Sequence, residues 1–447
     1  MSGAGLFGDL PETDVVASPA MGAPRMREPV RDQIELRPMD LDALLAAEHP
    51  ARVIWDYVRQ LDLRALEEAI RAREHTPGQA PASPRLLLSL WLFATSQGVG
   101  SARALDRLCK SHDAYRWLCG GVSVNYHGLS DFRLAHPELL DRLLSENIAT
   151  LSMAGVLNLD EVVQDGVRVR ASAGASSFRR KKTLHKELRK AARLIERLKQ
   201  ETDDDPDASN RRIKAGQERA ARERAERVAA AQKALSEITQ RRKQREKKCG
   251  DRKKQNKEPR ASTTDPDARV MKMADGGFRP AYNCQISSVA KGQIVIAVQA
   301  ETNGSDRGLI RPMLDQLQHR YHRLPRRHLV DGGFNKNEDT EWAATVGVNV
   351  YGPPVRSKHK TDPYAARRDD GPGVAAWRKR MKSPHGKGVF KRRGMGECIN
   401  ARFRQWRLYQ FTVRGREKVN TVLHWFALAA NILAGHRLTM AARAGSA

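Results

Sequence analysis

The spacing of apolar residues changes along the chain and divides it into parts with different predicted structure. Between residues 41 and 154, apolar positions recur at intervals of three and four, which predicts helices joined by short turns. One of these helices, residues 85–96, is apolar on nearly every side and is expected to be buried, with Pro84 in its first turn and Ser83 as its cap. The others are predicted at residues 41–47, 51–73 and 102–110, from 115 onward, and at 137–154.

Glycine turns connect the short helices of this first part. Gly98 and Gly100 precede the helix at residues 102–110, which Ser101 can cap. Short helices joined by tight turns permit a helix-turn-helix that reads DNA, and they also permit simple helical packing. The pattern leaves both interpretations open.

The periodicity becomes two around Asp165. Val163, Val167 and Val169 share its parity, so this segment is predicted to be a strand whose valine-bearing face also carries the carboxylate. A carboxylate on a half-buried face is costly unless it is paired or bound to a metal ion. The alternative is an aspartate that only shapes a turn before Gly166.

Residues 179–261 differ in composition from both flanks. Lys, Arg, Glu, Gln and Ala dominate, and apolar residues such as Leu184 and Leu188 form a thin stripe along each of two arms, which are separated near Asp203. We expect an antiparallel helical hairpin that interrupts the following domain in sequence only. Its end, residues 241–260, carries mostly Lys, Arg and Gln, as in segments that contact DNA phosphates, are disordered or are simply solvated.

The rest of the chain is predicted to be a mixed α/β region. Two apolar strands, residues 282–289 and 293–300, flank the turn at Gly292 and form a hairpin. No element is evident in the basic segment 354–388. The other predicted elements are a helix at residues 306–321, a strand ending at Asp331, a helix at 337–346, a strand at 348–351, a helix opened by Glu397 and a helix at 419–436.

The tetrapeptide Asp-Gly-Gly-Phe occurs twice, beginning at Asp275 and at Asp331. Asp331 ends an apolar strand and precedes a helix, which is where α/β proteins assemble their sites. Asp275 precedes its strand instead. Of the two, we therefore select Asp331 as a candidate site residue.

The composition of the chain indicates which class of molecule it binds. The 447 residues carry 79 Lys and Arg against 52 Asp and Glu, a net charge of +27, and this excess favours a polyanion partner. No apolar run reaches the length of a membrane span, and the start of the chain lacks the pattern of a secretory signal. The five cysteines form no C-x-x-C pair and are expected to be reduced thiols of a cytoplasmic protein. Residues 1–30 are expected to form a mobile leader.

Glu397 is surrounded by arginines in the sequence. Its helix also carries Arg402 and Arg404, and Arg393 lies four residues before it. Such an acid is either an ion-pair partner of Arg393 or a ligand for a cation beside bound phosphates.

The order Phe390, Arg393, Glu397, Arg404 resembles the Y-x2-R-x3-E-x6-K signature of DDE transposases from bacterial insertion sequences. Two positions depart from that signature. Phe390 stands where the family has Tyr and lacks the hydroxyl, and Arg404 replaces Lys but keeps the charge.

The resemblance implies an α/β fold with an RNase H-like catalytic core, residues 159–178 and 262–440, interrupted by the basic hairpin at 179–261. An all-α, DNA-binding N-terminal domain, residues 31–158, would precede it, and 441–447 would be a tail. Asp165, Asp331 and Glu397 would be the catalytic residues and would bind Mg²⁺ or Mn²⁺, with two ions acting together. The DNA-binding residues would be Phe390, Lys391, Arg392, Arg393 and Arg404.

The function implied is cleavage of DNA at the ends of an insertion sequence, followed by strand transfer into target DNA. The partners would be double-stranded DNA, as terminal inverted repeats and target, and a second copy of the chain in a synaptic dimer. No membrane is involved, and the protein would be cytoplasmic and associated with the nucleoid. Two alternatives remain, a metal-dependent nuclease on the same fold without strand transfer and a non-catalytic DNA-binding protein.

Overall fold

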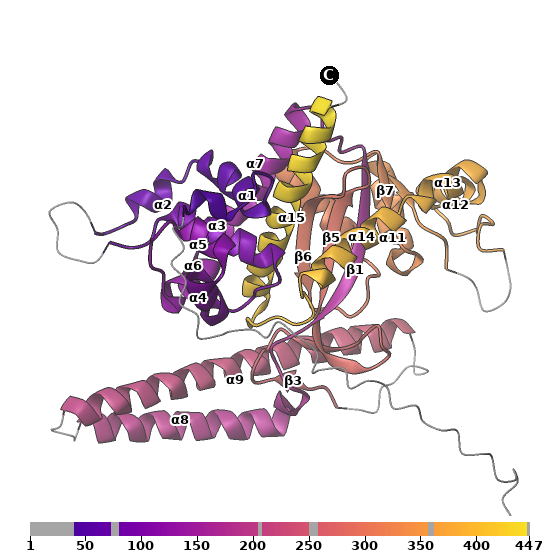
Figure 1. The fold of residues 1–447 in the computed structure, drawn as a ribbon. Coiled ribbons are helices and arrows are strands. Elements are labelled where there is room, and N and C mark those ends of the chain that lie inside the picture. Colours follow the sequence, from indigo (N-terminus) through magenta and orange to yellow (C-terminus); the bar gives the residue numbers. More distant parts are fainter. Residues whose placement is uncertain (1–39, 73–79, 204–207, 250–257, 356–361, 445–447) are drawn as a thin grey trace, which may run out of the picture. The chain divides into compact units, whose positions relative to one another are not determined.

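A mixed sheet of six strands lies at the centre of the residues that the computed structural model describes, which are 40–72, 80–203, 208–249, 258–355 and 362–444 (Figure 1). The strand order is β4-β5-β1-β7-β8, and β6 pairs with β5. The strands are β1 (Glu161–Arg170), β4 (Arg269–Lys272), β5 (Phe278–Val289), β6 (Ile294–Glu301), β7 (Arg327–Leu329) and β8 (Asn349–Tyr351).

The directions of the strands divide the sheet into two halves. β5 runs antiparallel to β1, β4 and β6, whereas β1, β7 and β8 run parallel to one another. The predicted hairpin is confirmed as β5 and β6, although β5 begins earlier, at Phe278. The mixed α/β class that the periodicity predicted is therefore confirmed.

The described residues from 40 to 158 contain helices and no strand. Ser83 caps α3 by accepting a hydrogen bond from the backbone N–H of Arg85, as predicted. The prediction of one helix over residues 51–73 was wrong, because a first helix ends at Arg59 and a separate short helix begins at Arg64, where the Asp62 carboxylate accepts the Arg64 N–H. The predicted helix at 41–47 is only a 3₁₀ turn, Asp42–Leu44. The helices are α1 (Pro50–Arg59), α2 (Arg64–Glu68), α3 (Pro84–Ser96), α4 (Ala102–Ser111), α5 (Asp113–Cys119), α6 (Tyr126–Ala135) and α7 (Pro137–Met153).

Helix α15 (Arg416–Ala444) connects these helices to the sheet (Figure 1). It packs against β6 as well as against α3 and α7. The side chain of Asn431 exchanges two hydrogen bonds of 2.7 Å with the backbone of Val295, so it takes the place of a neighbouring strand at that point. Trp406 packs near Phe403 and Phe426, at the edge of the core beside α15.

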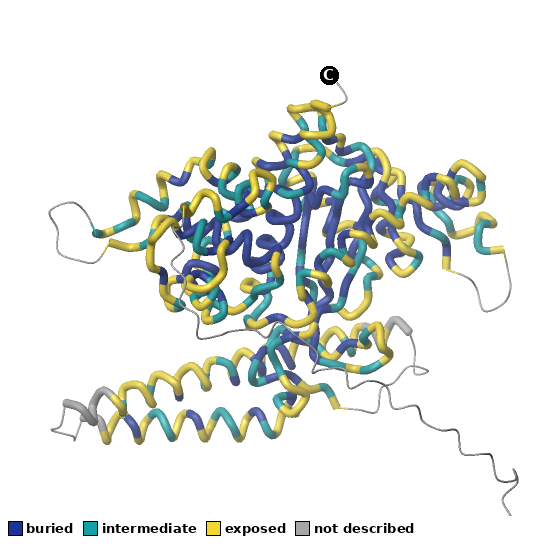
Figure 2. The backbone as a smooth tube through the Cα atoms, in the orientation of Figure 1, coloured by how far each residue is buried: buried dark blue, intermediate teal, exposed yellow. Residues whose placement is uncertain are grey.

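The basic insertion forms the expected pair of helices, α8 (Lys181–Asp203) and α9 (Ala208–Cys249). Leu184 packs with Val228, Ala231 and Leu235 along their contact. Figure 2 shows long exposed stretches on both helices, in contrast to the buried strands of the sheet. Two short strands, β2 (Phe178–Arg179) and β3 (Ala261–Ser262), pair at the base of the hairpin.

Two predictions in the second half of the chain were wrong. The helix expected from residue 306 is α10 (Ile310–Tyr321), because Asp306 instead accepts side-chain hydrogen bonds from β5. Within the segment expected to lack elements lie α12 (Pro372–Lys382) and α13 (Pro384–Lys391). Each has a proline in its first turn, and α12 buries Val374 and Trp377 ahead of its basic residues. The helix after Asp331 is α11 (Asn337–Thr345), close to its predicted bounds.

The composition of the chain predicted reduced cysteines and no membrane span. The described cysteines Cys109, Cys119, Cys284 and Cys398 are free thiols, as expected. No helix among the described residues combines the length and apolarity needed to cross a membrane. The predicted leader, residues 1–30, lies outside the described residues.

Candidate active site

Asp165 lies in the middle of β1, the strand with parallel β7 on one side and antiparallel β5 on the other. Its side chain is 19% exposed. Oδ1 accepts the backbone N–H of Gly166 at 3.0 Å, and Oδ2 accepts the side-chain amide of Asn400 at 2.7 Å. The aspartate is therefore oriented by two donors from different elements.

The surroundings of Asp165 disfavour its charged form. Burial raises the pKa of Asp165, and the negative charges of Asp306 and Glu397 act in the same direction. The hydrogen bond from Gly166 and the charge of Arg393 oppose this shift without cancelling it. A carboxylate held in this way gains from a nearby cation.

Helix α14 (Gly394–Gln405) begins three residues before Glu397, which was predicted to open it, and it brings Glu397 to the same strand as Asp165. Its first turn is packed so closely that a Cβ atom at Gly396 would lie 2.6 Å from Cγ1 of Val163 and 3.9 Å from Cβ of Asp165. Only a glycine permits this approach without a shift of the helix or the strand. The glycine at position 396 therefore allows α14 to pack beside Asp165, and Glu397 is the next residue of that helix.

Arg393 lies between the two acids. Its Nη2 is 2.6 Å from Oε1 of Glu397, and its Nη1 is 3.9 Å from Oδ1 of Asp165. The intrahelical ion pair considered for Glu397 is therefore present, yet the same guanidinium also faces an acid on β1. Glu397 itself is 61% exposed, so solvent and ligands can reach it.

Asp331 is positioned by the short strand β7. The parallel register pairs Val163 with Leu329, so Asp165 and Asp331 each lie two residues beyond paired positions. Neighbouring strands are about 4.8 Å apart, and residues of equal parity face the same side. Asp331 is exposed and accepts the N–H of Gly332 at 2.7 Å. Asp275, the rejected alternative, lies in the turn between β4 and β5 and pairs with Arg279.

The acids differ in how closely the structure brings them together. Asp165 and Glu397 share Arg393, whereas no contact of Asp331 with either of them is recorded among the described residues. Among all the residues that the structure describes, no three His, Cys, Asp or Glu side chains lie close enough together to bind one metal ion.

The chemistry of the donors nevertheless fits Mg²⁺ or Mn²⁺. Carboxylate and amide oxygens are hard ligands of the kind that these ions prefer. The buried Oδ1 of Asn400 has no hydrogen-bond partner, which leaves a further oxygen beside Asp165. The desolvated carboxylate of Asp165 supplies the negative charge.

Two residues near Asp165 were missing from the sequence prediction. Asn400 could have been found, because positions 393, 397, 400 and 404 lie on one face of the helix. Asp306 accepts hydrogen bonds from Asn283 at 2.7 Å and Gln285 at 3.0 Å, and its Oδ1 would lie 2.5 Å from a Cβ at Gly166. The one feature of the sequence that could have indicated a role for Asp306 is its position shortly after the second strand of the predicted hairpin.

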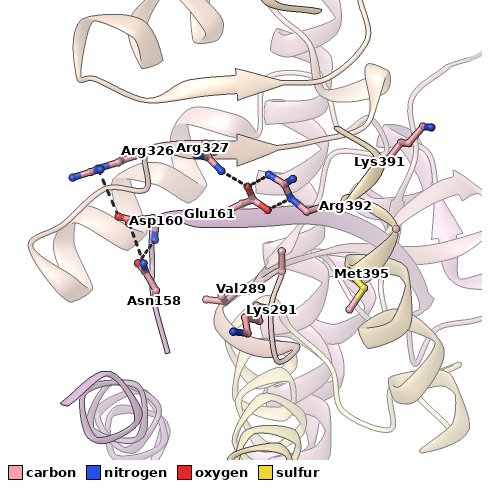
Figure 3. A pocket seen from close by; sticks show the side chains of 12 residues that line it. Asn158, Asp160, Glu161, Val289, Lys291, Arg326, Arg327, Lys391, Arg392 and Met395 are labelled. Atoms are coloured by element: carbon pink, nitrogen blue, oxygen red, sulfur yellow. Dashed lines mark hydrogen bonds and ion pairs between the residues drawn. The ribbon is translucent and has the colours of Figure 1, made fainter. Parts of the chain in front are cut away.

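The five residues expected to contact DNA have different environments. Phe390 is partly buried, with the guanidinium of Arg393 5.9 Å from its ring centre. Lys391 and Arg404 are exposed, and no ion pair of either is recorded within the described residues. Arg392 is committed to Glu161 through two hydrogen bonds of 2.5 and 2.6 Å (Figure 3).

The raised pKa of Asp165 leads to a prediction about stability in the absence of divalent cations. Because the folded-state pKa lies above the unfolded one, the native protein loses stability as Asp165 ionises with rising pH. Asp165→Asn should therefore raise the melting temperature in EDTA at pH 7 and have little effect at pH 3. The Asn400 amide can rotate so that its free Oδ1 accepts the new side-chain N–H. Thermal unfolding followed by circular dichroism across this pH range measures the effect.

Asp275→Asn is the control of opposite sign. Hydrogen bonds from Arg279 and from the Gly277 N–H lower the pKa of Asp275, so its charged form stabilises the native state at neutral pH. This variant should be no more stable than the native chain at pH 7. A fall in melting temperature for Asp165→Asn at pH 7 would contradict the assigned environment of Asp165.

Comparison with known proteins relates the chain to transposases. Residues 39–134 match the sequence model of a family described as a transposase domain (DUF772). This match covers about a fifth of the chain, namely the helical part and none of the acids described above. No curated protein and no solved structure matches the chain. The match supports a transposase family, a transposition-related function and DNA as the partner.

Proposed function

We propose that this protein is a DDE-type transposase that cleaves DNA at the ends of an insertion sequence and transfers the freed strand into target DNA. The observation that carries the proposal is the arrangement around β1. Asp165 and Asp331 follow paired positions of two parallel strands, and the helix of Glu397 packs on β1 through Gly396.

The strand order supports an RNase H-like core. Along the path β6-β5-β1-β7-β8, β5 is antiparallel to β6 and β1, and β7 and β8 are parallel to β1, while β4 pairs with the start of β5. This agrees with the strand hairpin followed by parallel strands that the resemblance implies. The basic helices α8 and α9 leave this core after β1 and return before β4. The transposase-domain match lies upstream, at residues 39–134.

Asp165, Asp331 and Glu397 would hold the divalent cation. When bound, Mg²⁺ or Mn²⁺ activates an attacking oxygen and stabilises the leaving oxygen of a phosphodiester. The protein contributes the orientation of Asp165 by Gly166 and Asn400. No side chain has to act as a covalent nucleophile, since water and then a DNA 3′-OH can serve.

The basic residues of α14 would act on the DNA. Arg404 is exposed on the same helical face as Glu397 and can contact a phosphate. Arg393 lies against two of the acids and limits their repulsion of a nearby phosphate. A dimer that holds two DNA ends together is part of the proposal.

The test uses the purified full chain and DNA that carries the sequences flanking its gene. With Mg²⁺ or Mn²⁺ we expect cleavage that leaves a 3′-OH, followed by products joined to a second DNA. Cleavage without joined products would favour the nuclease alternative. DNA binding without cleavage under either cation would contradict the proposal and favour a non-catalytic protein.

A further inference from the structure

A pocket of about 910 Å³ opens beside the start of β1 (Figure 3). It lies where β1 and β7 begin, and it is also lined by the end of β5 and the start of α14. Five of its lining residues are basic and two are acidic. The basic residues are Lys291, Arg326, Arg327, Lys391 and Arg392.

Both acidic residues of the pocket are already paired with arginines. Glu161 accepts hydrogen bonds from Arg392 and, at 3.1 Å, from Arg327, and Figure 3 shows both guanidinium groups converging on it. Burial raises the pKa of Glu161, but these two arginines hold it below its usual range, so the acid stays charged. Asp160 pairs with Arg323 and Arg326.

Two lysines remain for a ligand. No hydrogen bond or ion pair of Lys291 or Lys391 to any of the described residues is recorded. They come from the turn after β5 and the end of α13, which are far apart in the sequence but line one pocket. Two unpaired cations, with the excess charge of the arginines behind them, favour an anionic ligand.

Apart from Asn158, which donates a hydrogen bond to Asp160, the remaining side chains of the lining are apolar. Val289, Ala290 and Met395 contribute them between the charged groups. A small inorganic anion would contact the charged groups and make no contact with the apolar lining. A strand of nucleic acid uses both kinds of lining, because its phosphates meet the cations while its sugars and bases contact the apolar atoms.

The pocket is connected to the candidate active site through two elements. Glu161 precedes Asp165 by four residues of β1, a distance of about 13 Å along a strand. Met395 precedes Glu397 by two residues of α14. At about 3.4 Å per nucleotide, one DNA strand spans that separation with about four nucleotides.

We propose that this pocket binds the DNA strand a few nucleotides from the phosphate that reacts, with Lys291 and Lys391 on its phosphates and Met395 against its sugars or bases. The proposal rests on the proposed function, because it requires DNA at the acids. It assigns a new binding role to Lys291 and the apolar lining, which have no sequence motif.

The experiment measures binding of a fluorescently labelled 30-base-pair duplex of random sequence in EDTA between 50 and 200 mM salt. The variant is Lys291→Ala/Lys391→Ala in the full chain. Loss of two phosphate contacts should reduce the slope of log affinity against log salt by about 1.8. Both lysines are charged side chains without recorded partners, so the variant should unfold at the temperature of the native chain.

Lys272→Ala/Lys379→Ala is the matched control, because it removes the same charge from two exposed lysines that do not line the pocket. Its salt slope should equal that of the native chain. Equal slopes for the control and the pocket variant would overturn the proposal. If the native protein cleaves DNA and Glu397→Gln does not, the proposed function stands, and equal slopes then mean that only the pocket assignment fails.

A labelled polyglutamate peptide tests the other class of polyanion. If the pocket variant loses affinity for the peptide and keeps the native slope for DNA, the pocket serves an acidic protein segment and the proposal is overturned. Failure of the native chain to bind duplex DNA would overturn both the proposal and the proposed function.

Discussion

Glu397→Gln is expected to reduce metal-dependent DNA cleavage and joining by about 10³-fold or more, while DNA binding is retained. The substitution keeps the size of the side chain and removes one negative charge from the group that would hold the cation. Glu397 is 61% exposed, and its recorded partner is Arg393, so the fold does not depend on its charge. Single-turnover cleavage at saturating protein, measured in Mg²⁺ and in Mn²⁺, separates the chemical step from binding.

Glu146→Gln is the matched control for this variant. Arg142 and Glu146 form an exposed i,i+4 pair with the same order of charges as Arg393 and Glu397. Loss of such a pair costs about 0.2–0.5 kcal/mol of helix stability. If both variants cleave like the native chain, Glu397 is only an ion-pair partner, and the three-acid site is wrong.

The local pattern of the sequence was sufficient for those parts of the fold that depend on neighbouring residues. Alternating valines around Asp165 predicted β1, and the regular apolar positions after Glu397 predicted α14. The same criterion failed for α12, because four of its last five residues are basic and only Val374, Trp377 and Met381 indicate its buried apolar face.

The contacts of the candidate site depend on residues that are distant in the sequence. Arg393 reaches Asp165 across 228 positions, and spacing within α14 gives no information about that contact. Asp306 is held by side chains of β5, so its position follows from the strand pairing and not from its own segment. The pocket beside Glu161 likewise needs four separate segments to come together.

Gly396→Ala is expected to lower the rate of DNA cleavage by about 10²-fold, the loss that a displacement of about 1 Å can cause. The new Cβ would lie 2.6 Å from Cγ1 of Val163, well inside contact distance. Val163 is fully buried and β-branched, so it cannot turn away easily, and α14 has to move instead. Glu397 and Asn400 would move with the helix. Overpacking of this kind also costs about 1–3 kcal/mol of stability.

Gly394→Ala, two residues earlier in the same helix, is the matched control. A Cβ atom at position 394 would meet nothing within 4 Å, and alanine favours a helix by up to about 1 kcal/mol over glycine. This variant should therefore cleave DNA like the native chain and unfold at the same or a slightly higher temperature. Equal cleavage by both alanine variants would show that the seating of α14 on β1 does not control the reaction.

A second substitution can distinguish displacement of the helix from a general loss of folding. Val163→Ala removes the Cγ1 atom that the new methyl group would strike. In the double variant Gly396→Ala/Val163→Ala, α14 can return toward β1, so cleavage should recover relative to Gly396→Ala alone. Residues in direct contact show interaction energies of about 0.5–3 kcal/mol in such cycles. Additive losses in the double variant would mean that the close contact at Gly396 does not position Glu397.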